Sequence, residues 1–309
     1  MTDFLKPGIR PDPVPTCGPR IPRKLWQTVR DRNAVPTDLA ACVDRLKAMH
    51  PDWEHTLFDD ETQAAFIDRV ASDRFRRAYD RINPRYGAMR SDVFRYLVVY
   101  LHGGVYLDLK SGTERPLDHI LRPDDRSLLS HWDNGPEGAY PGVGFHPVLA
   151  DMPRGEFQQW FVIAEPGHPY LAAALSEVVS NIETYRAFRF GHGYKGVLAV
   201  TGPVAFTRAV RRTAEAGTHR MIEAEACGLR YTMLRHPDAH LNQGGTHYSR
   251  IFEAPITSRH LEGAALAGYW AHEVLYWPIS TLRSLNHARL HRRRETRRGK
   301  RASGATPPG

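Results

Sequence analysis

Two charged side chains end an apolar stretch of the sequence. Residues 86–112 read YGAMRSDVFRYLVVYLHGGVYLDLKSG, in which Asp108 is followed two positions later by Lys110. A carboxylate accepts hydrogen bonds from hydroxyl groups or binds a hard cation, and an ammonium group neutralises phosphate. The same two residues could form a simple salt bridge, and their spacing alone does not decide between ligand binding and structure.

A second charged pair lies inside the same stretch. Asp92 and Arg95 are three residues apart, so on a helix they share one face. Their neighbours are Val, Phe, Tyr and Leu, and we therefore expect both charges to be at least partly buried and to need partners. The alternative is an exposed ion pair on the helix surface, which contributes only about 0.2–0.5 kcal/mol.

An alternating pattern of strands and helices must position these residues. Strands are predicted for residues 21–28, 53–60 and 105–110, and helices for residues 36–51, 61–82 and 86–101. Thr37 is the expected N-cap of the first helix, and Gly103 and Gly104 are expected to end the third. The order predicts an α/β fold with a Rossmann-type, mostly parallel sheet flanked by helices, where ligands bind at the carboxyl ends of the strands.

The third predicted strand carries the first charged pair. Because side chains alternate along a strand, Tyr106, Asp108 and Lys110 would share one face, and the apolar side chains between them would be buried on the other. We therefore expect Asp108 and Lys110 to lie side by side at the rim of a ligand pocket.

Composition narrows the class of protein. With 309 residues, 41% hydrophobic and 25% charged, the chain is typical of a soluble globular protein. The Pro-rich residues 1–20 contain no apolar leader, and no run of about 18 apolar residues suggests a membrane span, so we expect a cytoplasmic location. Cys17, Cys42 and Cys227 are too far apart for a zinc or redox motif and are expected to be reduced.

The positive charge is concentrated at one end of the chain. Residues 291–309 carry a net charge of +6 out of +8, which leaves +2 for everything before them. This distribution predicts a disordered basic tail and argues against a nucleic-acid-binding domain. Attraction of the tail to anionic lipid would place the protein peripherally at the inner face of the membrane.

Other enzyme classes lack their motifs here. His272 and Glu273 begin an H-E-x-x-H pattern, but Tyr276 stands where the second histidine is required. The sequence contains neither the G-x-x-x-x-G-K-[ST] phosphate loop nor the G-x-S-x-G nucleophile elbow, so zinc protease, P-loop and serine hydrolase functions lose support.

The combined pattern resembles a known enzyme family. The runs S-D-x-x-R-Y and G-G-V-Y-L-D, with an upstream I-P-x-x-L-W-Q and a downstream T-G-P-V-A-F, are similar to glycosyltransferases with a DXD sugar-binding region. These are the retaining enzymes of glycosyltransferase family 32, related to yeast α-mannosyltransferases and capsule hexosyltransferases. The resemblance spans residues 21–207 and implies a GT-A fold that binds a nucleotide sugar, a UDP- or GDP-hexose.

The resemblance also implies roles for single residues. Trp26 would stack on the nucleobase of the donor, or else be an ordinary core tryptophan. Asp92 and Arg95 match the pair that holds sugar hydroxyls and phosphate, Tyr106 would pack near the nucleotide, and Asp108 matches the first aspartate of the DXD motif.

Lys110 departs from the DXD motif. In that motif the carboxylates bind Mg²⁺ or Mn²⁺, and the ion neutralises the diphosphate leaving group. Lysine cannot bind such an ion. Two interpretations stay open: Asp108 and another ligand, with His247 as the candidate, hold a metal while Lys110 contacts phosphate, or Lys110 replaces the metal.

A long loop precedes the candidates for the chemical step. Residues 130–147 are rich in Gly, Pro, Asn and aromatic residues, a composition typical of an ordered functional loop. Glu156 and Gln159 follow it, and one of them is expected to face the anomeric carbon; Asp92 is a further catalytic candidate. A polar helix start is the alternative interpretation of Glu156 and Gln159.

Two functional hypotheses follow. The first is a retaining glycosyltransferase that moves a hexose to a glycan or lipid-linked acceptor in surface polysaccharide or glycoconjugate synthesis. The second is a non-catalytic sugar-binding relative whose DXD motif has degenerated to Asp-Leu-Lys. In both, residues 21–290 form one domain, with the donor core at about 21–120 and the acceptor and catalytic part at about 121–290, between the lead 1–20 and the tail 291–309.

Overall fold

The computed structural model describes residues 3–213, 219–234 and 251–282. Within them a six-stranded sheet has the order β2-β1-β3-β6-β5-β7, and three of its five pairings are parallel. Its strands are β1 (Lys24–Thr28), β2 (Glu54–Phe58), β3 (Gly104–Leu107), β5 (Ser127–Leu129), β6 (Phe161–Ala164) and β7 (Arg220–Met221). A separate ladder joins β4 (Gly112–Thr113) to β8 (Leu229–Arg230).

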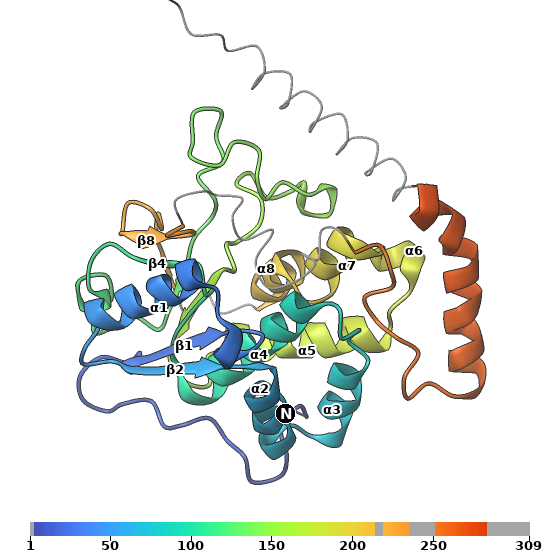
Figure 1. The fold of residues 1–309 in the computed structure, drawn as a ribbon, viewed down its shortest axis with the longest axis horizontal. Helices are drawn as coiled ribbons and strands as arrows, with labels where there is room; N and C mark the ends of the chain where they lie inside the picture. Colours follow the sequence, from blue (N-terminus) through green and yellow to red (C-terminus); the bar gives the residue numbers. More distant parts are fainter. Residues whose placement is uncertain (1–2, 214–218, 235–250, 283–309) are drawn as a thin grey trace, which may run out of the picture.

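Helices cover both faces of this sheet (Figure 1). They are α1 (Thr37–Met49), α2 (Asp60–Val70), α3 (Asp73–Asp80), α4 (Gly87–His102), α5 (Pro169–Glu183), α6 (Ala187–Phe190), α7 (Gly193–Val200), α8 (Pro203–Arg212) and a last helix over residues 263–282, with 3₁₀ turns at Arg32–Ala34, Leu117–His119 and Pro147–Leu149. The architecture confirms the predicted fold class, an α/β fold with a mostly parallel sheet flanked by helices.

Strand β3 lies near the centre of the sheet and is buried on both faces. Tyr106 packs into the core formed with α2, α4 and α5, whereas Val105 and Leu107 pack into the core on the α1 side. Side chains therefore alternate as predicted, but Tyr106 is enclosed in the core. Helix α4 is apolar almost all round because it is enclosed between the sheet and α5.

Two predicted helix boundaries are wrong. Pro36 is the N-cap of α1, and Thr37 is the first helical residue. The helix expected over 61–82 is two helices, because the Ser72 side chain accepts a hydrogen bond from Phe75 N and starts α3. The predicted end of α4 is confirmed: Gly103 follows it with a φ of 64°, a conformation that favours glycine.

The segments before and after the predicted domain are the lead 1–20 and the tail 291–309. The lead packs on the domain, since Phe4 and Leu5 are buried in the core and Lys6 N donates to Val70 O at 2.9 Å. The tail 291–309 lies outside the described residues. All three cysteines are free thiols, as predicted. In the described part of the chain, no helix is long and apolar enough to cross a membrane.

Candidate functional site

A tight turn follows the central strand and presents Asp108. The backbone N–H of Ser111 donates to Asp108 O at 2.8 Å, and Asp108 N donates to Trp160 O at 2.8 Å. The buried side chain of Gln27 donates to Asp108 O at 3.4 Å. Asp108 and Lys110 thus belong to a turn, so the predicted strand over 105–110 is wrong after Leu107: local backbone hydrogen bonds end the ladder there.

Arg95 holds the carboxylate of Asp108. Its guanidinium lies 3.0 Å from Asp108 Oδ1 and donates to the backbone oxygen of Gln159 at 2.6 Å. The aromatic ring of Tyr106 lies beneath it, with the guanidinium carbon 4.6 Å from the ring centre. Because these contacts come from three different elements, the guanidinium has little freedom to move, and it fixes Asp108 in turn.

Asp92 holds Arg95 from the other side. Its Oδ1 lies 3.4 Å from the guanidinium and accepts a hydrogen bond from Gln159 Nε2 at 3.0 Å, while its Oδ2 accepts one from Thr201 Oγ1 at 2.8 Å. Burial raises the pKa of Asp92, and Arg95 and the two hydrogen bonds oppose this shift. In this structure Asp92 contacts protein groups, so it positions Arg95.

Burial excludes one interpretation of this pair. The side chains of Asp92 and Arg95 are 6% and 7% exposed, so they are not an ion pair on the helix surface. Asp108 is 27% exposed, which makes it the accessible carboxylate of the three charges.

Lys110 extends from the turn toward Tyr231. Its ammonium donates to Tyr231 Oη at 2.7 Å and lies 3.9 Å from the centre of the same ring. Burial lowers the pKa of Lys110 to about 8, although the Asp108 carboxylate favours the charged form. Asp108 is paired with Arg95 and Lys110 with Tyr231, so the two form no salt bridge with each other.

Aromatic residues from distant parts of the chain surround Tyr231. Its ring centre lies 5.1 Å from that of Trp132 and 6.0 Å from those of Tyr140 and Trp160. Tyr140 and Tyr231 are half-buried and so expose part of their rings beside Lys110. A partly exposed aromatic surface next to an ammonium suits a ligand that combines a planar or sugar ring with phosphate.

The two candidates for the chemical step lie in buried hydrogen-bond networks. Gln159 connects Asp92 to Tyr96, whose hydroxyl accepts from Gln159 Nε2 at 2.6 Å. Glu156 accepts from Trp132 Nε1 at 3.0 Å, and its other oxygen lies 2.6 Å from His146 Nε2. Neither residue is a polar helix start. The loop 130–147 is thus attached to Glu156, as expected of an ordered loop.

Trp26 and Tyr106 are enclosed in the core. Trp26 is 5% exposed, donates from Nε1 to Gly103 O at 2.8 Å and packs near Phe58. Tyr106 is 1% exposed, and its hydroxyl is 2.8 Å from Thr28 Oγ1. The geometry favours the interpretation of Trp26 as an ordinary core tryptophan. Tyr106 packs against the Arg95 guanidinium and helps to position it.

A divalent metal does not fit the described residues alone. At the turn, Lys110 takes the place of the second carboxylate, and one oxygen of Asp108 is already paired with Arg95. No group of three or more His, Cys, Asp or Glu side chains that could hold a metal occurs in the part of the chain that the structure describes. The candidate ligand His247 lies outside the described residues.

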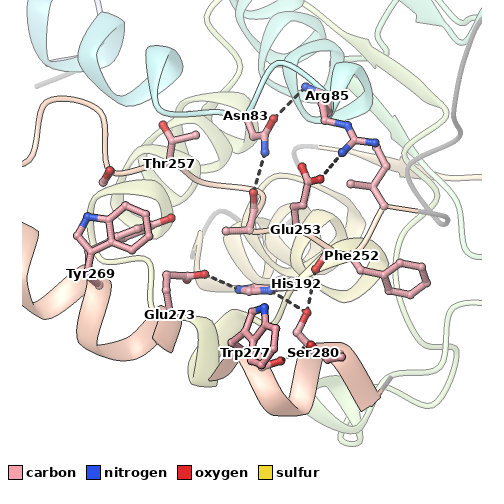
Figure 2. A pocket seen from close by; sticks show the side chains of 15 residues that line it. Asn83, Arg85, His192, Phe252, Glu253, Thr257, Tyr269, Glu273, Trp277 and Ser280 are labelled. Atoms are coloured by element: carbon pink, nitrogen blue, oxygen red, sulfur yellow. Dashed lines mark hydrogen bonds and ion pairs between the residues drawn. The ribbon is translucent and has the colours of Figure 1, made fainter. Parts of the chain in front are cut away.

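A separate cavity of about 660 Å³ lies under the last helix (Figure 2). Asn83 and Arg85 line it from the α3–α4 connection, and Arg85 pairs with Glu253. None of Asp92, Arg95 and Asp108 lines this cavity.

Several residues of the site could not be singled out from the sequence. Thr201 was visible only as part of the T-G-P-V-A-F run, and its hydrogen bond to Asp92 gives that run a role. Tyr231 lies 121 residues from Lys110 along the chain and His146 ten residues from Glu156, and no local pattern marks either of them.

Comparison with known proteins finds a family model that matches the segment carrying Asp92, Arg95 and Asp108. Residues 36–127 match the family model described as "glycosyltransferase sugar-binding region containing DXD motif". The chain is 31% identical over 188 residues to inositol phosphoceramide mannosyltransferase 3 of Schizosaccharomyces pombe, covering 60% of this chain and 43% of that protein. It is 25% identical over 196 residues to the initiation-specific alpha-1,6-mannosyltransferase of the same yeast, covering 62% and 48%.

The chain spans less than half the length of these two relatives. Among solved structures it is similar to the PaToxG glycosyltransferase, with a TM-score of 0.45, 14% identity and coverage of 63% of this chain and 70% of that one. Asp92, Arg95 and Asp108 all lie inside the matched segment 36–127. The segment that carries these three residues is therefore similar to glycosyltransferase sugar-binding regions that contain a DXD motif.

Proposed function

We propose that this chain is a glycosyltransferase that moves a hexose from a nucleotide sugar to a glycan or lipid-linked acceptor. One observation carries the proposal: an accessible carboxylate, Asp108, is fixed by the buried Arg95 at the carboxyl end of the central strand, with the Lys110 ammonium in the same turn. Both yeast relatives are named mannosyltransferases, which supports mannose as the sugar.

The geometry supports a distinct task for each residue of the turn. The Asp108 carboxylate accepts hydrogen bonds from hydroxyl groups of the donor sugar. The Lys110 ammonium offsets the negative charge that develops as the nucleoside diphosphate leaves. Tyr231 orients that ammonium and, with Tyr140, offers ring surface to the donor. Asp92 and Arg95 act through Asp108 as positioning residues.

We propose retention of configuration, on the resemblance to retaining enzymes. Glu156 and Gln159 are the candidates to face the anomeric carbon. Both are buried, at 5% and 6% exposed, so this role requires their side chains to move when the donor binds. Mixing donor and acceptor and following the anomeric proton of the first product by NMR tests the stereochemistry directly.

The metal requirement stays a proposal with two versions. In the first, Asp108 binds Mg²⁺ or Mn²⁺ together with His247; in the second, Lys110 alone supplies the positive charge. Only the first version predicts that EDTA stops transfer by the wild-type chain.

We further propose that the reaction serves surface polysaccharide or glycoconjugate synthesis at the cytoplasmic face of a membrane. The basic residues 291–309 support peripheral contact with anionic lipid, since each basic side chain near such a surface contributes about 1 kcal/mol.

The alternative function is a non-catalytic sugar-binding module. Lys110 in place of the second aspartate favours it, because lysine cannot bind the metal ion that the DXD motif holds. The intact buried network around Arg95 favours the enzyme, because a module without catalysis has no need to keep two charges buried.

Incubation with a panel of UDP- and GDP-hexoses separates the two functions. An enzyme releases nucleoside diphosphate from at least one donor, and Asp108→Asn reduces that release. A module binds sugar but releases no nucleoside diphosphate from any donor, with or without Mn²⁺ and with a mannoside acceptor present.

A further inference from the structure

The last helix, residues 263–282, exposes a large apolar surface. Its large exposed apolar side chains, here called the outer face, are Trp270, Val274, Leu275, Trp277, Ile279 and Leu282. Trp277 and Val274 are each 68% exposed, and Leu275 is 66% exposed. Single exposed apolar side chains are common on proteins, but six on one helix form a patch that normally has a partner.

Contacts on the opposite side hold the helix in this orientation. Tyr269 and Tyr276 are buried, and Tyr269 Oη donates to Ile256 O at 2.8 Å. Glu273 lies 3.0 Å from His192 Nε2, and Ser280 donates to Phe252 O at 3.0 Å (Figure 2). Tyr269, Glu273 and Ser280 thus face the cavity. Within the outer face, Trp270 and Trp277 also line the cavity while more than half of each side chain stays exposed, whereas Val274, Leu275, Ile279 and Leu282 do not line it. The helix itself lies at the edge of the domain (Figure 1).

The outer face carries no charged side chain. Between residues 263 and 282 the acidic and basic side chains are those of Glu273 and His272, and neither belongs to the exposed positions. A surface helix of a soluble protein normally presents charged residues to water, so a face without them is unusual unless lipid or another protein covers it. Tryptophan is the residue most typical of the boundary between water and lipid.

The charge that follows the helix identifies the partner. Residues 283–309 contain nine Arg and Lys residues and one Glu, a net charge of +8 that equals the charge of the whole chain. An apolar helix face that leads directly into such a segment matches an anionic bilayer, with acyl chains for the apolar side chains and headgroups for the cations.

We propose that the outer face of helix 263–282 inserts into the interfacial layer of an anionic lipid bilayer, and that the basic residues after it bind the headgroups. Insertion of this face is distinct from the electrostatic contact of the tail, and it does not depend on transferase activity. The helix lies in the plane of the interface and does not cross the bilayer.

The tryptophans allow a direct test on the unmodified protein. Trp26, Trp53, Trp132 and Trp160 are buried, so Trp270 and Trp277 are the two that lipid can reach. Vesicles of phosphatidylcholine and phosphatidylglycerol with brominated acyl chains should quench the fluorescence of the full chain, and the variant Trp270→Phe/Trp277→Phe should lose the quenched component. Sedimentation with the vesicles without any quenching would overturn the proposal.

A polar variant tests the apolar contribution. Glutamine keeps helix propensity, so Val274→Gln/Leu275→Gln/Leu282→Gln should fold normally and bind these vesicles at least about tenfold more weakly. Val143→Gln/Val148→Gln, which alters two exposed apolar residues elsewhere, is the matched control and should bind like wild type.

Two outcomes contradict insertion. The first is equal vesicle binding by the triple variant and wild type, all of it removed by high salt, which would leave the tail charge as the cause. The second is a wild-type dimer in sedimentation velocity that the triple variant lacks, with unchanged vesicle binding, which would assign the outer face to a second copy of the chain.

Discussion

Replacing Arg95 by methionine tests how the site is held together. The guanidinium lies 3.4 Å from Asp92 and 3.0 Å from Asp108. Methionine is unbranched and apolar, so Arg95→Met keeps most of the volume and removes the charge. Asp92 then keeps its hydrogen bonds from Gln159 and Thr201 but loses the positive charge beside it.

The expected magnitude follows from these contacts. Removing one partner of a buried ion pair lowers the free energy of unfolding by about 3–5 kcal/mol. Because Asp92 keeps two hydrogen bonds, we expect a value near the lower end, about 3 kcal/mol. Asp108 loses its ion pair with Arg95; with a loss comparable to that of one charge-assisted hydrogen bond, about 1.5–3 kcal/mol, transfer should fall roughly ten- to a hundredfold.

The pH dependence gives the sign of the effect. Burial already raises the pKa of Asp92, and removing Arg95 removes a group that opposes this. A carboxyl group whose pKa is higher in the folded state destabilises the fold as pH rises above its unfolded value of about 4. The stability deficit of Arg95→Met relative to wild type should therefore be largest near neutral pH and shrink toward pH 5 in urea denaturation.

A double variant controls for lost packing. Asp92→Asn removes the carboxylate that Arg95→Met leaves unpaired, so the double variant should be more stable than the sum of the single effects predicts. Additive effects within about 0.5 kcal/mol, or an Arg95→Met protein that unfolds at the same urea concentration as wild type, would refute the reasoning.

Three further predictions concern Lys110 and the tail. Because burial lowers the pKa of Lys110 to about 8, kcat/KM should fall as pH rises through that value. The variant Lys110→Arg should keep its rate to higher pH. A pH profile of this variant that equals that of wild type would show that Lys110 does not cause the fall. Lys110→Asp recreates a D-x-D pair and should make transfer dependent on Mn²⁺; an EDTA-resistant variant would show that the turn cannot recruit a metal. Deleting residues 292–309 should leave transfer to a soluble acceptor unchanged and weaken vesicle binding most at low salt, whereas loss of folding would show that the segment is structural.

Local patterns were sufficient for most of the helices, for the central strand as far as Leu107, and for the pair Asp92 and Arg95. The spacing of Asp92 and Arg95 placed them on one helix face, and their apolar neighbours correctly implied burial. The two glycines correctly ended α4. The turn at Asp108 was missed because the residue types in this stretch are compatible with both a strand and a turn. The backbone hydrogen bonds of Asp108 with Trp160 and Ser111 decide between the two conformations.

Long-range contacts account for what the sequence did not reveal. The partner of Arg95 is Asp108, on the following turn, and the partner of Lys110 is Tyr231, 121 residues away. The break before Ser72 was a different kind of miss: the signal, a serine followed by an aspartate at a helix start, was present and was overlooked.

The affinity for the donor diphosphate tests the central claim most directly. Titration calorimetry should compare wild type with Lys110→Ala for UDP and GDP and their hexose derivatives, at a pH below 8 where the ammonium is charged. If the turn binds the donor, at least one nucleotide should bind wild type, and Lys110→Ala should bind it about ten- to a hundredfold more weakly. Equal affinity of both proteins for every nucleotide bound, or no binding by either, would contradict the account.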